Sequence, residues 1–187
     1  MIGKSEMQEE MVMKRENLRK LVLTALLTAL VCVATLIIQI PSPMQGYLNL
    51  GDCFVLLSGW ILGPWYGFFA GGVGSMLADL FAGYALYAPG TLIIKGFAAL
   101  VAALLFAALS GRGEKYVWLW HLVSGTAGEI VMVAGYFGYT ALLMGRGIAA
   151  AASIPGNIVQ AAVGIAVSVP VSAIFRKYRL TEKLKER

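Results

Sequence analysis

The chain has 187 residues, of which 59% are hydrophobic and 13% are charged, and its mean hydropathy is +0.76. This composition excludes a soluble domain for most of the chain, and the length indicates one compact membrane domain without room for a separate catalytic module. The net charge of +5 does not indicate binding to nucleic acid, because the basic residues are distributed as a membrane topology requires.

Five apolar runs define the predicted membrane segments. They follow a lead at 1–17, which we expect to be a frayed or amphipathic cytoplasmic segment. The runs lie near 18–40, 53–81, 91–110, 117–144 and 155–175. A spanning helix needs about 20 residues to cross the hydrocarbon layer. Four of the runs therefore fit one crossing each.

The run at 53–81 is too long for one crossing and is interrupted by Gly63-Pro64-Trp65. Glycine and proline next to each other are typical of a tight turn. This run therefore predicts two short or tilted helices, at about 53–63 and 66–81, and the expected total is six.

The basic residues support six transmembrane helices with both termini in the cytoplasm. Under this topology, only Arg146 lies in an outer loop and only Lys95 lies within a span. The other thirteen of the fifteen lysines and arginines fall in cytoplasmic segments, as the positive-inside rule requires: Lys4, Lys14, Arg15, Arg19, Lys20, Arg112, Lys115, Arg176, Lys177, Arg179, Lys183, Lys185 and Arg187. The predicted fold is an all-α membrane domain at 18–176 with a basic cytoplasmic tail at 177–187.

Motifs of catalysis and of energy coupling are absent from the sequence. It has no Walker motif, no Ser/His/Asp arrangement and no paired metal ligands, so we predict no enzyme activity, no cofactor and no metal. Cys32 and Cys53 are isolated thiols without metal-ligand spacing and are expected to be packing residues. The single histidine, His121, is expected at the cytoplasmic interface.

Polar side chains at membrane depth are the main indication of function, because such groups are costly in lipid and usually mark a substrate site, an ion path or a buried pair. Most lie in the outer half of the predicted helices. Asn49 and Asp52 begin the second helix, Asp79 is near the outer end of the third, Lys95 is about one turn into the fourth, and Asn157 and Gln160 are in the first turns of the sixth. This depth favours an outward-facing pocket over a proton path through the membrane.

Each of these candidates has a structural alternative. Asp79 and Lys95 could neutralise each other across the third and fourth helices instead of contacting a ligand. Asp52 and Asn157 follow glycines at helix starts: Asp52 could be an N-cap or a first-turn acid favoured by the helix dipole, and Asn157 could cap the sixth helix. Glu129, near the middle of the fifth helix, could bond to a neighbouring helix or contact the ligand.

Tyrosines gather near the same outer ends. Tyr47, Tyr84 and Tyr87 lie in outer loops, and Tyr136 and Tyr139 lie near the outer end of the fifth helix. They could form an interfacial aromatic belt, or they could stack on a flat heteroaromatic ligand and bond to it through their hydroxyls. Tyr84, Tyr87 and Tyr136 are our candidates for such contacts, and the glycines and proline of the loop at 83–90 suggest a structured lid.

Small residues line one stripe of the first predicted helix. Ala25 and Ala29 are spaced by four residues and are flanked by Thr24 and Thr28. This spacing produces a flat stripe on which another helix can approach closely. Its position at the cytoplasmic end, beside a basic segment, suits docking to a partner.

These features together resemble the substrate-binding S components of energy-coupling factor (ECF) vitamin transporters, in the riboflavin-type group. The resemblance covers residues 18–176. It rests on the six-helix plan, Ala25-x-x-x-Ala29, the segment GYLNLGD at 46–52, Leu62-Gly63-Pro64 and TLIIKG at 91–96.

The resemblance implies a protein of the prokaryotic plasma membrane that binds a scarce water-soluble vitamin on the outer side. It implies docking through Ala25 and Ala29 on a transmembrane coupling subunit, which two cytoplasmic ATPases drive. It also implies that the whole S component topples in the membrane to deliver its ligand.

The ligand is indicated less directly. The form Asn-Leu-Gly-Asp at 49–52 is similar to S components assigned to vitamin B6 vitamers or to the thiamin precursor hydroxymethylpyrimidine, and riboflavin is the alternative. A basic ring nitrogen or an amine could meet Asp79 or Glu129, and hydroxyl groups could meet Asn157 and Gln160.

Two other classes of protein remain as alternatives. A secondary transporter driven by an ion gradient would need a continuous line of titratable groups, and only Glu129 is central in the membrane. A small membrane enzyme or a structural scaffold is the other alternative. The sequence lacks a nucleophile–base set, and scaffolds rarely keep this many polar groups at membrane depth.

Overall fold

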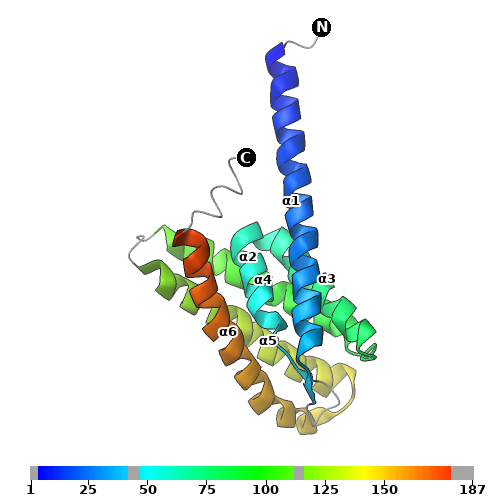
Figure 1. The fold of residues 1–187 in the computed structure, drawn as a ribbon. Coiled ribbons are helices and arrows are strands. Elements are labelled where there is room, and N and C mark those ends of the chain that lie inside the picture. Colours follow the sequence, from blue (N-terminus) through cyan, green and yellow to red (C-terminus); the bar gives the residue numbers. More distant parts are fainter. Residues whose placement is uncertain (1–3, 42–46, 112–115, 178–187) are drawn as a thin grey trace.

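The computed structural model describes residues 4–41, 47–111 and 116–177, which form a helical bundle with one short hairpin (Figure 1). The helices are α1 (Lys4–Ile37), α2 (Gly51–Leu62), α3 (Pro64–Phe81), α4 (Ala88–Ser110), α5 (Val117–Gly138) and α6 (Ile154–Lys177). Strands β1 (Ile40–Pro41) and β2 (Tyr47–Leu48) pair in antiparallel fashion between α1 and α2, and a π-helix, η2 (Tyr139–Leu143), and a 3-10 helix, η3 (Gly147–Ser153), connect α5 to α6. Parts of the predicted outer loop and charge pattern, at 42–46, 112–115 and 178–187, lie outside the described residues.

An all-α membrane protein agrees with these helices. Four helical segments are long and apolar enough to cross a membrane, judged by length and composition: Glu10–Ile37, Ala88–Ser110, Val117–Leu143 and Gly147–Lys177. Helix α2 is a shorter apolar helix. The count of six spans and the cytoplasmic placement of the termini stay predictions, although α1 begins and α6 ends at the same end of the bundle (Figure 1).

The predicted break between the second and third helices is confirmed. Helix α2 ends at Leu62, α3 begins at Pro64, and Gly63 between them has φ 85° and ψ −178°. This backbone conformation is essentially restricted to glycine. Proline is favoured at the first position of a helix because that position needs no amide hydrogen, so Gly63-Pro64 ends one helix and starts the next.

Small residues allow the helices to approach closely. A Cβ atom added at Gly59 of α2 would overlap the backbone carbonyl of Ala99 on α4. Around this contact, Val55, Ala98 and Met132 from α2, α4 and α5 are almost fully buried in one core cluster. Membrane helices commonly pack through small residues in this way, and the close packing holds the ends of α2, α4 and α5 in fixed positions.

One end of the bundle carries nearly all the irregular structure. The β1–β2 hairpin pairs Ile40 with Leu48 and Pro41 with Tyr47, and it lies beside the start of α6 at the end opposite the beginning of α1 (Figure 1). The turn between α3 and α4 and the η2 and η3 segments lie at this end as well. We call it the hairpin end, and it holds the candidate site.

Candidate functional site

A pocket at the hairpin end is formed by residues from almost every element that meets there. It contains about 500 Å³ of space between atoms, part of which is open to the outside. The lining consists of tyrosines, small hydroxyl residues, amides and one acid: Tyr47, Asn49, Asp79, Tyr84, Tyr87, Thr91, Tyr136, Thr140, Ser153, Asn157 and Gln160.

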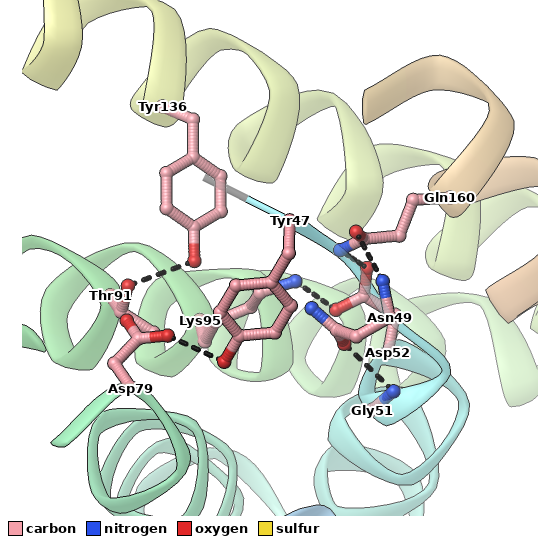
Figure 2. Close-up of polar contacts among 9 residues, drawn as sticks. All are labelled: Tyr47, Asn49, Gly51, Asp52, Asp79, Thr91, Lys95, Tyr136 and Gln160. Atoms are coloured by element: carbon pink, nitrogen blue, oxygen red, sulfur yellow. Dashed lines mark hydrogen bonds and ion pairs between the residues drawn. The ribbon is translucent and has the colours of Figure 1, made fainter. Parts of the chain in front are cut away.

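The floor of the pocket is fixed by a chain of contacts that runs from the hairpin into the core (Figure 2). The side-chain oxygen of Gln160 accepts the Asn49 backbone N–H at 3.0 Å, and its amide nitrogen donates to Asp52 Oδ2 at 2.7 Å. The other oxygen of Asp52 forms an ion pair with Lys95 of α4. Because Asp52 and Lys95 are each only 1–2% exposed, this pair is shielded from water and ties α2, α4 and α6 together.

A second set of polar contacts forms one wall. The hydroxyl of Tyr47 donates to Asp79 Oδ1 at 2.8 Å, so the hairpin is linked to the last turns of α3. Burial, together with the neighbouring Asp79 carboxylate, raises the pKa of Tyr47, which keeps its hydroxyl protonated and able to donate. Beside this pair, the Thr91 and Tyr136 hydroxyls lie 3.0 Å apart (Figure 2).

The turn between α3 and α4 is held over the pocket by aromatic contacts. The rings of Tyr47 and Tyr84 are 4.8 Å apart at 48°, and those of Tyr87 and Tyr139 are 6.3 Å apart. The Tyr139 hydroxyl donates to the backbone carbonyl of Leu86 at 2.6 Å. These contacts connect the turn to the hairpin on one side and to η2 on the other, as a structured cover requires.

Seven of the nine predicted ligand-binding residues line this pocket, from four separate parts of the chain: Asn49, Asp79, Tyr84, Tyr87, Tyr136, Asn157 and Gln160. The other two, Lys95 and Glu129, lie outside its lining. The Lys95 Nζ atom is 5.5 Å from the centre of the Tyr136 ring, so it lies near the lining but is engaged with Asp52.

The structure also decides between the structural alternatives. Lys95 pairs with Asp52 rather than with Asp79. Asp52 does not cap α2, because Leu50 occupies the cap position without a side-chain bond and Asn49 Oδ1 instead accepts the Gly51 N–H at 2.9 Å. Asp52 is an acid in the first turn of α2 and forms a buried ion pair with Lys95.

Glu129 occupies a separate position deeper in the bundle. It is 3% exposed, and its Oε2 atom has no hydrogen-bond partner in the described part of the chain. A Cβ atom at Gly164 would lie 3.4 Å from Glu129 Oε1 and 2.9 Å from the Asp52 Cβ. Glu129 and Asp52 therefore both lie against α6 at Gly164, and Glu129 does not line the pocket.

Three hydroxyl residues of the lining were not predicted as contacts: Thr91, Thr140 and Ser153. Thr140 lies in the π-helix and Ser153 ends the 3-10 helix, and such departures from regular α-helix leave no periodic pattern in the sequence. Thr91 begins the segment TLIIKG, and its place in the first turn of α4 was the only signal that could have marked it.

The remaining polar candidates are structural. Cys32 and Cys53 are buried free thiols, in agreement with the packing role expected for them. His121 is buried as well, with Trp60 edge-on at 4.6 Å and Phe106 at 4.1 Å. Within the described residues, no group of three or more histidine, cysteine, aspartate or glutamate side chains is placed to hold a metal ion.

Comparison with known proteins shows what this arrangement is similar to. Residues 15–177 match the sequence model of the family described as "ECF-type riboflavin transporter, S component". The thiamine precursor transporter HmpT of Lactococcus lactis subsp. cremoris (strain MG1363) is 32% identical over 168 residues, which are 89% of this chain and 93% of the relative. A protein of Pyrococcus woesei, described only as an uncharacterized protein in a gap 3′ region, is 39% identical over 148 residues, which are 79% of this chain and 95% of the relative.

A solved structure has the same fold. It is described as the S component of a bacterial ECF transporter, superposes with a TM-score of 0.61 and covers 91% of this chain and 99% of its own. Its sequence is 23% identical, so it supports the arrangement of the helices.

Proposed function

Because the chain belongs to the family of S components of ECF-type riboflavin transporters, we propose that the pocket at the hairpin end binds the molecule that this subunit delivers for import. Proteins of this family are transporter components for vitamins or vitamin precursors and are not enzymes. The position of the pocket, at the end opposite the start of α1 (Figure 1), fits capture on the outer side of the membrane under the predicted topology.

The single observation that carries this proposal is the composition of the pocket. Four tyrosines provide flat apolar surface with polar edges, and Thr91, Asn157 and Gln160 add groups that both donate and accept hydrogen bonds. A small aromatic ring carrying hydroxyl and amino groups matches such a lining, because its faces can stack and its edges can bond.

The best-supported ligand is the thiamin precursor hydroxymethylpyrimidine. The relative HmpT, which is 32% identical along most of both chains, is described as a thiamine precursor transporter. The enclosed part of the pocket is small, which favours a ligand with one ring. A vitamin B6 vitamer, also a single substituted ring, is the second candidate, and riboflavin, with three fused rings, would require the pocket to widen.

The same family membership supports a proposal about partners. We expect the subunit to dock, through the surface around Ala25 and Ala29, on a transmembrane coupling subunit that two cytoplasmic ATPases drive, in a prokaryotic plasma membrane. Both alanines are exposed on α1, and their neighbours Leu21, Val22 and Leu26 are 55–59% exposed. An apolar face of small and large side chains suits contact with another membrane helix.

Calorimetric titration of the purified protein tests the binding proposal. Calorimetry is preferred to tryptophan fluorescence, because a tryptophan far from the pocket does not report on binding there. Trp120 lies 16 residues before the pocket residue Tyr136 on α5, or about 24 Å along the helix. We expect hydroxymethylpyrimidine to bind at one site, pyridoxine to bind more weakly and riboflavin not to bind. An absence of heat with all three ligands would show that the proposed function is wrong.

Two neighbouring residues of α6 provide a matched pair of variants. Asn157 lines the pocket, whereas Ile158 is 54% exposed and does not line it. Asn157→Trp should fill the pocket and abolish binding, and Ile158→Trp should bind as the wild type does. Equal affinity in the two variants would place the ligand elsewhere in the molecule.

A further inference from the structure

We propose that Asp79 selects the ligand, by accepting a hydrogen bond at its Oδ2 atom from an N–H group on the edge of the bound ring. This inference rests on the proposed function and goes one step further, since it names the chemical feature that the pocket recognises. The feature is an N–H donor on a six-membered nitrogen ring. An aminopyrimidine presents it as an exocyclic amino group, and a pyridine presents it as a protonated ring nitrogen.

The Asp79 carboxyl group has a buried acceptor atom that no donor in the described part of the chain satisfies. Asp79 lines the pocket and is only 5% exposed. Its Oδ1 atom accepts from Tyr47. Its Oδ2 atom is buried and forms no hydrogen bond of normal length among the residues that the structure describes, because the neighbouring Thr91 hydroxyl pairs at 3.0 Å with Tyr136 instead (Figure 2). Buried carboxylate oxygens are costly when unpaired and are normally satisfied in a working site. A donor supplied by the ligand would satisfy this one.

Buried acids outnumber buried bases among the residues that the structure describes. Among the described residues, the buried carboxylic acids are Asp52, Asp79 and Glu129, and the buried bases are Lys95 and His121, of which His121 packs against Trp60 and Phe106 away from the pocket. The ammonium group of Lys95 is paired with Asp52. The pocket therefore presents an acid whose charge is not matched by a direct ion pair, which favours a ligand that brings a cation or N–H donors.

The position of Asp79 in the pocket decides whether a bound ring meets it with its edge or with its face. The carboxyl group lies between Tyr47 and the Thr91–Tyr136 pair, with tyrosine rings on the adjoining walls (Figure 2). A flat ligand that stacks on these tyrosines turns its edge, rather than its face, toward Asp79. An edge with only carbonyl oxygens would place acceptor against acceptor, so the pocket should reject it.

The test compares two pyrimidines on two proteins. Wild type and Asp79→Asn are titrated with hydroxymethylpyrimidine and with 5-(hydroxymethyl)-2-methylpyrimidine, which lacks only the amino group. We expect the wild type to prefer the amino compound by about tenfold to a hundredfold, the range for a hydrogen bond to a charged group. In Asp79→Asn the preference should fall to about threefold or less, because a carboxamide is a weaker acceptor than a carboxylate.

Tyr47→Phe separates recognition from architecture. This variant removes the hydrogen bond to Oδ1 but keeps the carboxylate, so affinity for both compounds should fall while the preference for the amino compound remains. A preference in Asp79→Asn equal to that of the wild type would overturn the inference. The inference would also be overturned if Asp79→Asn lowered the affinity for both compounds by the same factor, since that is the result expected of a purely structural side chain.

A second arm distinguishes the two sources of the N–H group. Pyridoxine is compared with its benzene analogue, in which CH replaces the ring nitrogen, on the same proteins. If Asp79 recognises a ring N–H group, the preference for pyridoxine over its benzene analogue should disappear in Asp79→Asn. If the wild type binds neither ring, the proposed function fails and the inference with it. If the wild type binds a ring without discriminating in either arm, only the inference fails.

Discussion

The buried ion pair between Lys95 and Asp52 is the central contact at the scale of single residues. Asp52 also accepts a hydrogen bond from Gln160, which in turn accepts one from the Asn49 backbone. Through these contacts a charge pair in the core sets the position of the hairpin that lines the pocket. The pair therefore has a structural role, and we expect ligand recognition to fall to the residues that line the pocket.

Removing one partner of this pair should strongly destabilise the protein. We expect Lys95→Met to lower the free energy of unfolding by about 3–5 kcal/mol, because Asp52 would be left buried without a counter-charge. The double variant Lys95→Met with Asp52→Asn should recover most of the loss. Unfolding of the detergent-solubilised protein, followed by circular dichroism, measures both.

An exposed ion pair on α1 provides the control for this prediction. Lys14 and Glu10 lie 2.7 Å apart with side chains that are 75% and 54% exposed. Lys14→Met should change the free energy of unfolding by less than about 1 kcal/mol, as exposed pairs do. If Lys95→Met and Lys14→Met have equal effects, the buried pair is not the support described above.

The close contact of α2 and α4 is the feature that matters at the scale of elements. Gly59 lies against the carbonyl of Ala99. Gly111, at the end of α4, has φ −66°, and a Cβ added there meets no packed atom of another element within 4 Å in the described part of the chain. Gly59→Ala should cost about 1–3 kcal/mol through overpacking. Gly111→Ala should change the free energy of unfolding by no more than about 0.5 kcal/mol.

Thermal unfolding of the two glycine variants checks this prediction. The helix approach would be looser than described if Gly59→Ala melted at the temperature of Gly111→Ala. A larger loss in Gly111→Ala than in Gly59→Ala would contradict the packing outright.

Regular elements and their breaks could be predicted from the sequence. Gly63-Pro64 marks the break between α2 and α3, and most of the polar residues predicted at outer helix ends line one pocket because the fold brings those helix ends together. The partner of Lys95 could not be predicted, since spacing along one helix does not fix its rotation against another. The π-helix that carries Thr140 could not be predicted either, because the 3.6-residue period assumes a regular helix.

At the scale of the whole molecule, the proposed binding pocket and the expected docking face do not share residues. The pocket is at the hairpin end, whereas Ala25 and Ala29 are exposed on α1, about two to three helical turns before its last residue, and line no part of the pocket. We therefore expect the two surfaces to act at different steps, capture first and delivery second.

This separation predicts that transport can be lost without loss of binding. Ala25→Trp and Ala29→Trp should abolish uptake by cells that carry the coupling module, because a large side chain prevents close approach of a partner helix. Calorimetric affinity should stay within about threefold of the wild type, since neither residue lines the pocket. The control is Ile130→Trp, at a site on α5 that is 62% exposed, which should transport normally.

Uptake of labelled ligand by cells provides the readout for these three variants. Normal transport by both alanine variants would show that α1 is not the docking face. Loss of binding as well as uptake would mean that the two surfaces are coupled.

The most direct test of the binding function identifies what the protein retains when it is purified from cells grown with vitamins. Denaturing the wild type should release one single-ring nitrogen compound, hydroxymethylpyrimidine or a B6 vitamer, at close to one molecule per chain. Mass spectrometry identifies the released compound. Asn157→Trp, purified in the same way, should release none. Recovery of a flavin, or of no small molecule from the wild type, would contradict the account.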